Sequence, residues 1–123
     1  MSLNAALIYS LLAALPVAMH IGVASGAPWG RFTVGGRFAD TLPPLWRGLA
    51  LIQAAILCAM AVVMLDRGGI IALGIAAEVF WGCIGVTALS TLANAISPSR
   101  AERLLWTPVL VLMTGSSVAL AVF

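Results

Sequence analysis

One carboxylate stands alone in a long apolar stretch of this chain. Glu78 is the only acidic or basic residue between Ile70 and Ala95. An unpaired carboxylate is costly to bury in a protein interior, and an ionisable group within a membrane segment is by default a hypothesis of function. The sequence therefore singles out Glu78 as an intramembrane polar residue.

Three other polar side chains share this apolar setting, namely His20, Gln53 and Asn94. Histidine and a desolvated carboxylate both suit proton movement. At the rise per residue of a helix, His20 and Glu78 are expected to lie about 15 Å apart in depth, so Gln53 or water would have to bridge them. The competing interpretation is that these side chains join helices through hydrogen bonds of about 0.6–2 kcal/mol each.

Small residues surround Glu78 on one predicted helix face. Gly74, Gly82 and Gly85 recur with Glu78 at spacings of four, four and three residues. Such spacings align side chains on a helix, and small residues allow a second helix to approach closely. Glu78 is therefore expected to point into a tight contact or a small cavity, formed either with the first or second helix or with a second copy of the chain.

Arginine forms a second group of candidate functional residues. Two similar triplets, Gly30-Arg31-Phe32 and Gly36-Arg37-Phe38, occur in one loop. An arginine beside an aromatic ring suits the headgroup layer of a membrane, where its guanidinium binds phosphate. The candidates for an anionic headgroup or ligand are Arg31, Arg37, Arg47, Arg100 and Arg103. The alternative is that these arginines only anchor the protein, with Asp40 and Glu102 as local ion-pair partners.

The composition indicates that lipid surrounds most of the chain. Of 123 residues, 63% are hydrophobic and 8% are charged, and the mean hydropathy is +1.13. An average soluble domain carries about 25% charged residues. A soluble fold of this size would expose more surface than so few charged side chains can cover.

Four apolar segments are long enough to cross a bilayer as helices: Leu3–Val23, Leu45–Leu65, Ile70–Ala95 and Leu104–Phe123. A crossing needs about 20 apolar residues. We therefore predict one all-α domain, residues 1–123, which is an integral membrane bundle of four transmembrane helices. The second and third helices are joined by only Asp66–Gly69, so we expect them to be antiparallel neighbours.

The arginines also predict the orientation of the bundle. Five of the six lie in or beside the loops 26–46 and 96–103, and only Arg67 falls on the opposite side. Positive side chains favour the cytoplasmic side. We expect a bacterial inner membrane protein with both termini outside the cytoplasm. Trp29, Trp46 and Trp106 fall near the predicted cytoplasmic interface, where indoles concentrate.

The last helix has a recognisable start. Ser99-Arg100-Ala101-Glu102 fits a capping box, in which Ser99 is the N-cap and the Glu102 side chain reaches back to the Ser99 backbone N–H. The pair Ser97-Pro98 offers a competing start, with proline at the first helical position. Glu102 is therefore expected either to take part in this cap or to pair with an arginine.

Two groups of residues are distinctive enough to suggest a family. They are Gly26-Ala27-Pro28-Trp29-Gly30, Gly35-Gly36, Leu42-Pro43 and Arg47, and then Asn94, Ser97, Ser99, Glu102-Arg103 and Thr107-Pro108. Together they resemble a group of small bacterial four-helix integral membrane proteins without assigned function. The resemblance covers most of the chain and implies the four-span architecture. It implies no activity, cofactor or catalytic residue.

Motifs for catalysis and cofactors are absent from the sequence. A single histidine cannot build a multi-histidine metal or haem site, and no phosphate-binding loop or nucleophile motif occurs. We expect no cofactor, no metal and no nucleic-acid partner, and no enzyme activity. An enzyme acting on lipid, with Glu78 as acid or base, ranks below the other hypotheses.

Two functions remain from different classes. The first is a membrane binding or accessory protein that recognises a lipid headgroup, a hydrophobic small molecule or a partner membrane protein. The second is a small oligomeric transporter or channel that uses Glu78 and His20 as proton sites. Expected partners are membrane lipids, with a homodimer or another membrane protein as a further possibility.

Overall fold

The protein is all-helical in a computed structural model that describes the backbone of residues 2–123 and the side chains of residues 4–123. The α-helices are α1 (Ser2–Ala24), α2 (Pro44–Arg67), α3 (Ala77–Ala95) and α4 (Arg100–Val122), and two 3-10 turns, η1 (Gly30–Phe32) and η2 (Val34–Gly36), lie between α1 and α2. The prediction of an all-α chain with four helices is confirmed.

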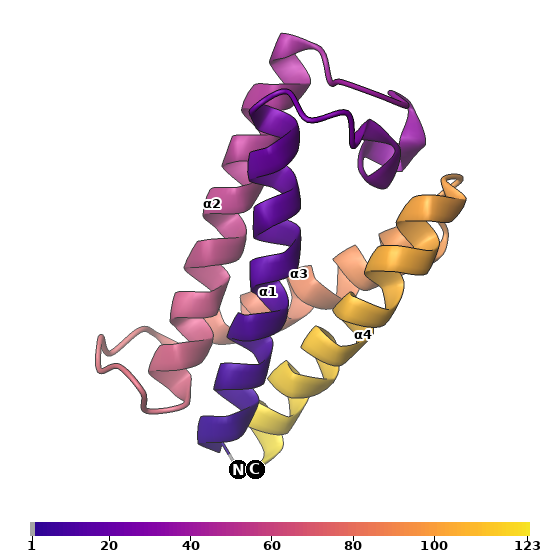
Figure 1. Ribbon diagram of the computed structural model, residues 1–123. Helices are drawn as coiled ribbons and strands as arrows, with labels where there is room; N and C mark the ends of the chain where they lie inside the picture. The colour runs from indigo at the N-terminus through magenta and orange to yellow at the C-terminus, as the bar shows by residue number, and fades with distance from the viewer. Residues whose placement is uncertain (1) are drawn as a thin grey trace.

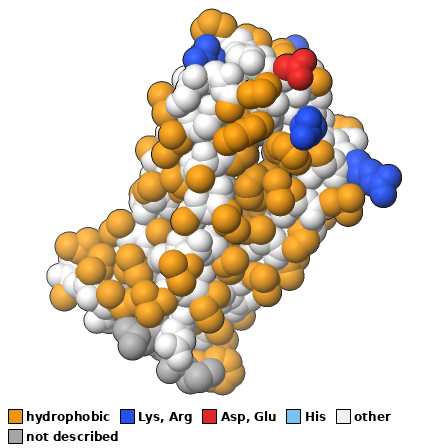
Figure 2. Space-filling view, viewed as in Figure 1, with side chains coloured by type: hydrophobic (Ala, Val, Ile, Leu, Met, Phe, Trp, Pro, Cys, Tyr) orange, Lys and Arg blue, Asp and Glu red, His pale blue; other side chains and the backbone are white. Residues whose placement is uncertain are grey.

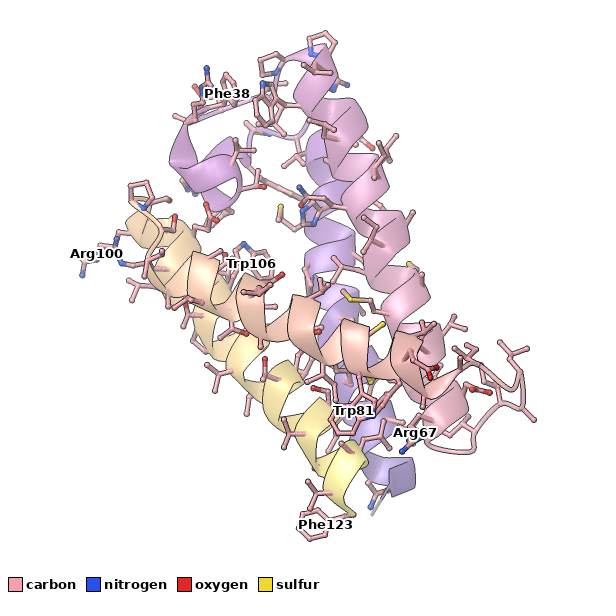
Figure 3. All side chains as sticks on the ribbon, turned by 180° about the vertical axis from the view of Figure 1, so that it is seen from behind. Phe38, Arg67, Trp81, Arg100, Trp106 and Phe123 are labelled. Atoms are coloured by element: carbon pink, nitrogen blue, oxygen red, sulfur yellow. The ribbon has the colours of Figure 1, made fainter. Side chains whose placement is uncertain are left out.

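The four helices form two antiparallel hairpins, α1 with α2 and α3 with α4 (Figure 1). The hairpins meet mainly where α1 packs on α4. Helix α3 runs obliquely behind α1, so it lies near α2 only close to the segment that joins them and diverges from it toward the other end (Figures 1 and 3). The helices α2 and α3, predicted to be antiparallel neighbours, are therefore neighbours only next to their connection.

Three helices are long and apolar enough to cross a membrane, namely α1 from Asn4 to Ala24, α2 and α4. Helix α3 is not among them. The sequence predicted that this helix begins at Ile70, but it begins at Ala77, so its predicted length was too great. Residues 68–76 form a nonhelical segment that connects α2 to α3.

Asp66 explains why the third helix begins late. Its carboxylate accepts backbone hydrogen bonds from Leu73 (2.6 Å), Gly74 (3.2 Å) and Ile75 (3.0 Å). A side chain that binds backbone N–H groups in this way competes with helix formation. Gly69 and Gly74 have φ of 80° and 67°, a left-handed conformation that glycine adopts without strain. The segment therefore wraps around Asp66.

The core takes side chains from all four helices, and two hydroxyl pairs join α3 to α1 and to α4. Tyr9 of α1 is fully buried, and its hydroxyl lies 2.7 Å from Thr87 Oγ1 on α3. Thr91 of α3 and Thr114 of α4 are joined in the same way at 2.9 Å. Hydroxyl pairs of this kind join membrane helices with a small net gain in free energy.

Large apolar side chains cover the outer surface of the bundle. Leu11 on α1, Leu89 on α3 and Leu112 on α4 are 71%, 68% and 58% exposed. Hydrophobic atoms spread over the whole face seen in Figure 2, whereas the charged side chains visible there gather at the end that carries the loop between α1 and α2. This distribution suits a surface that contacts lipid.

Candidate functional site

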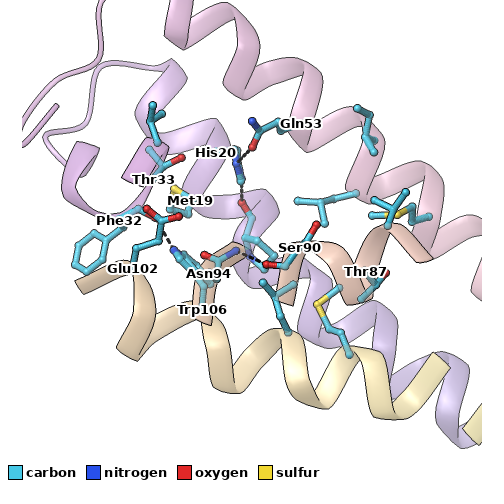
Figure 4. Close-up of a pocket in the computed structure, with 18 of the residues that line it drawn as sticks. Met19, His20, Phe32, Thr33, Gln53, Thr87, Ser90, Asn94, Glu102 and Trp106 are labelled. Atoms are coloured by element: carbon cyan, nitrogen blue, oxygen red, sulfur yellow. Dashed lines mark hydrogen bonds between the residues drawn. The ribbon is translucent and has the colours of Figure 1, made fainter. Parts of the chain in front are cut away.

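A cavity of about 430 Å³ lies between the two hairpins, below the loop that joins α1 to α2 (Figure 4). Its apolar wall is built from Met19, Ile56, Leu57, Met60, Val86, Leu110 and Met113. Its polar wall is built from His20, Thr33, Gln53, Thr87, Ser90, Asn94 and Glu102. Ile56 and Val86 line the cavity and are still exposed, so the cavity opens sideways between α2 and α3. We call this cavity the interhelical pocket.

The roof of the interhelical pocket is fastened to α4 by two hydrogen bonds. Trp106 Nε1 donates to the Phe32 carbonyl oxygen at 2.7 Å, and Ser99 Oγ donates to the Arg31 carbonyl oxygen at 2.7 Å. The loop is closed on itself by Gly30, whose N–H donates to the Asp40 carbonyl at 2.8 Å. Phe32 and Thr33 are thereby held over the pocket, although they are more than 60 residues from Trp106 in sequence.

His20 and Gln53 join α1 to α2 at the pocket wall. His20 is buried, its Nδ1 lies 2.6 Å from the Pro16 carbonyl oxygen, and its Nε2 lies in hydrogen-bond contact with the side-chain oxygen Oε1 of Gln53. Because Nδ1 faces an acceptor, it must carry a proton. The Gln53 oxygen can pair with Nε2 only if that nitrogen also carries a proton, whereas a neutral imidazole needs the Gln53 amide turned by 180°, so that its NH₂ donates to Nε2. Both arrangements satisfy the two ring nitrogens.

Glu102 points into the pocket and does not complete a capping box. Ser99 is the N-cap of α4, and its Oγ accepts from the Glu102 backbone N–H at 3.2 Å. The Ser99 backbone N–H, however, is bound by Ser97 Oγ at 3.2 Å. The expected return bond from the Glu102 carboxylate is therefore replaced. Glu102 Oε2 is buried and has no hydrogen-bond partner.

The arginines take other partners. Arg47 Nε donates to the Ala24 carbonyl at 3.0 Å, and Arg103 donates to the Ser97 carbonyl at 2.7 Å. Arg31 lies over the ring of Phe32, with 4.7 Å between its guanidinium carbon and the ring centroid. Arg37 lies over the ring of Phe38 in the same way, with 5.4 Å between its guanidinium carbon and the ring centroid. None of these four arginines is a pocket residue.

The remaining charged candidates lie at the surface. Arg100 and Asp40 are exposed. The expected ion pairs of Asp40 and Glu102 with arginines, which would have locked the two loops together, are thus replaced by hydrogen bonds that run through Ser99 and Trp106. Side chain-to-backbone bonds fix this geometry without requiring two charges to be buried together.

Glu78 lies away from the pocket. It is exposed in the first turn of α3, where the partial positive charge of a helix N-terminus favours a carboxylate. Nothing lies within 4 Å of the Cβ positions at Gly74, Gly82 and Gly85. The expectation that this face packs on another helix of the same chain is wrong, while packing against a second copy stays a prediction.

The structure thus brings together three of the four predicted intramembrane polar residues. His20, Gln53 and Asn94 all line the interhelical pocket, and Asn94 donates its side-chain amide to the Ser90 carbonyl at 2.8 Å. Glu78 does not join them. Sequence reasoning assigned Glu102 to a cap and missed its place in the pocket, and it also missed Thr33 and Phe32. The sequence signal that could have pointed to Glu102 was the pattern of small and polar residues from Asn94 to Glu102.

The chain matches no protein-family model, and no curated protein and no solved structure is significantly similar to it. The site is therefore interpreted from its own geometry.

Proposed function

We propose that this chain is a membrane protein that binds a hydrophobic or amphipathic small molecule in the interhelical pocket. The observation that carries the proposal is the cavity between two helix hairpins that opens sideways. Its volume of about 430 Å³ falls within the range of about 300–1,000 Å³ that small-molecule sites occupy. Apolar walls with a few convergent polar groups are also typical of such sites.

The direction of the opening favours a ligand that arrives through the lipid. Ile56 on α2 and Val86 on α3 flank the opening, and each is close to half exposed. A molecule dissolved in the acyl layer would enter between these side chains without crossing the charged loop end. Its polar group would then meet His20, Asn94 or Glu102 inside.

Four crossings with both termini outside the cytoplasm form part of this proposal. The two termini lie at one end in Figure 1, and α4 begins toward the other end, below the loop between α1 and α2. In the proposed topology α3 returns the chain across the membrane, although it runs strongly obliquely to α1 and α2 (Figures 1 and 3). Cysteines introduced at Arg37 and Arg67, in a chain lacking Cys58 and Cys83, should react with a membrane-impermeant reagent from opposite sides. Labelling of both from one side would contradict this orientation.

Filling the opening of the pocket tests the binding proposal. Val86→Trp enlarges the side chain of a pocket residue that is 46% exposed and flanks the opening. Val79→Trp is the matched control, because Val79 is 48% exposed and lies two turns earlier on the same face of α3 but is not a pocket residue. Each protein would be extracted with its surrounding lipid in nanodiscs, and its retained small molecules identified by native mass spectrometry.

The wild-type protein and Val79→Trp should retain a bound molecule that Val86→Trp loses. Retention of the same molecule at the same occupancy by Val86→Trp would contradict the proposed site. Circular dichroism on all three proteins shows whether the fold is unchanged.

A further inference from the structure

We propose that the interhelical pocket selects a lipophilic monocation, that is, an ammonium or phosphonium centre that carries apolar groups. This inference rests on the proposed function, because it names the class of ligand for the same pocket. It is drawn from the charge, the aromatic ring and the hydrogen-bond acceptors of the pocket wall.

Glu102 supplies the negative charge. Its Oε2 atom is buried without a hydrogen-bond partner, and its side chain is part of the pocket wall. His20 is the other ionisable lining residue, and both of its ring nitrogens already have partners in Pro16 and Gln53. A buried carboxylate oxygen without a partner is costly, and a bound cation removes that cost.

The local sequence explains why this carboxylate is available. Ser97 Oγ accepts a hydrogen bond from the Ser99 backbone N–H, which in a capping box would donate to the Glu102 carboxylate. Arg103, next to Glu102 in sequence, is held by the Ser97 carbonyl. The nearest backbone N–H is therefore occupied, and the neighbouring guanidinium is directed to the Ser97 carbonyl and not to Glu102.

Trp106 places an aromatic ring beside the same carboxylate. It follows Glu102 by four residues on α4, so the two side chains lie on one face of the helix. Trp106 is buried, and its Nε1–H is already directed to Phe32, which fixes the indole in the pocket wall (Figure 4). A cation over an indole face is stabilised by the charge distribution of the ring, and alkylated ammonium groups are commonly recognised in this way.

The other polar groups of the wall are neutral amides and hydroxyls, apart from His20. Asn94 uses one amide N–H on Ser90, which leaves its other N–H and its carbonyl oxygen for a ligand. Among the lining residues that the structure describes, none is an arginine or a lysine. A phosphate or carboxylate would therefore meet the Glu102 carboxylate and no positive charge except a protonated His20. The same argument disfavours a zwitterionic phospholipid, whose phosphate accompanies its amine.

Tetraphenylphosphonium and tetraphenylborate provide a direct test, since they share a shape and differ in the sign of their charge. Binding would be measured by equilibrium dialysis to the full chain in phosphatidylcholine nanodiscs, with empty nanodiscs subtracted. The variants are Glu102→Gln, which removes the charge, and Glu78→Gln, which removes an exposed carboxylate outside the pocket as a matched control. Partition into lipid is the same for each variant and cancels in the comparison.

Wild-type protein and Glu78→Gln should bind the phosphonium ion saturably, and Glu102→Gln should bind it about tenfold or more weakly, a change of about 1.4 kcal/mol in binding free energy. Tetraphenylborate should not show this loss. Equal binding of the phosphonium ion by wild type and Glu102→Gln, or absence of saturable binding by wild type, would overturn the selectivity for cations.

The two proposals fail separately. If Val86→Trp loses its retained molecule while Glu102→Gln binds both ions as wild type does, the binding site in the pocket is supported and its selectivity for cations is contradicted. If Val86→Trp retains everything, the pocket itself falls. Should Glu102→Gln not fold, the two ions on wild-type protein decide the matter, because stronger saturable binding of tetraphenylborate would contradict the inference.

Discussion

Trp106 on α4 donates its indole N–H to the carbonyl oxygen of Phe32, and this 2.7 Å hydrogen bond joins positions 74 residues apart in the chain. It ties the loop after α1 to the last helix directly above the interhelical pocket. The loop is thus a fixed part of the pocket wall, and this bond is one of the two that hold it on α4.

Replacing Trp106 with phenylalanine keeps an aromatic ring and removes this bond. The Phe32 carbonyl then lacks its partner, so the free energy of unfolding should fall by about 1–3 kcal/mol. Hydrogen exchange measured by mass spectrometry should become faster across residues 30–36. The control is Trp81→Phe, since Trp81 is 55% exposed on α3. Unchanged exchange in Trp106→Phe would show that other contacts hold the loop.

The contact between His20 and Gln53 should be energetically coupled. Gln53→Leu leaves the buried Nε2 of His20 without a partner and should lower the free energy of unfolding by about 1–3 kcal/mol. Adding His20→Leu should then cost less than it does in the wild-type protein. A double-mutant cycle, measured by unfolding in mixed micelles of sodium dodecyl sulfate, gives the coupling energy. Purely additive effects would contradict a direct hydrogen bond.

Asp66 should determine the structure of the segment before α3. Asp66→Ala removes the acceptor for Leu73, Gly74 and Ile75, so their amides should exchange faster with solvent. Asp40→Ala is the control, since the Asp40 side chain is exposed. A helix that extended N-terminally from Ala77 in Asp66→Ala, seen as slower exchange over residues 70–76, would instead indicate that apolar helix propensity dominates once the carboxylate is gone.

Gly30 should tolerate no side chain. A Cβ atom there would lie 2.0 Å from the Phe38 carbonyl oxygen and 2.4 Å from that of Asp40, both of them backbone atoms. Gly30→Ala must therefore displace the loop, and its melting temperature should fall clearly below that of the wild-type protein. At Gly48 on α2 nothing lies within 4 Å, so Gly48→Ala should melt at or above the wild-type temperature, since alanine favours a helix. Similar melting temperatures for the two variants would contradict the close packing of the loop.

Apolar segments and helix breakers were sufficient to predict that the chain has four helices. The length and the hydropathy of an apolar segment can be read directly from the residues within it. The start of α3 was not predictable in this way. Residues 70–76 are almost as apolar as the helix they precede, and what excludes them from it is one carboxylate that binds three amides. Such a competition between a side chain and the helical backbone depends on the geometry of a turn, which hydropathy does not report.

The candidate site was predictable only in part. His20, Gln53 and Asn94 were identified because polar residues in apolar segments are rare, and the structure brings them to one cavity. Glu78 belonged to the same class by composition, but the late start of α3 moves it to an exposed first turn. Glu102 was masked by its capping motif, since the sequence does not show that Ser97 takes the place of its carboxylate.

The two hairpins meet chiefly along α1 and α4, whereas α2 and α3 separate away from their connection. A change of the angle between α1 and α4 would therefore alter the distance between α2 and α3. In a bilayer, lateral pressure that brings α2 toward α3 would then narrow the entrance through which the proposed ligand arrives. Distances between spin labels on these two helices should shorten in lipids that pack more tightly, and a constant distance would mean that the angle is rigid.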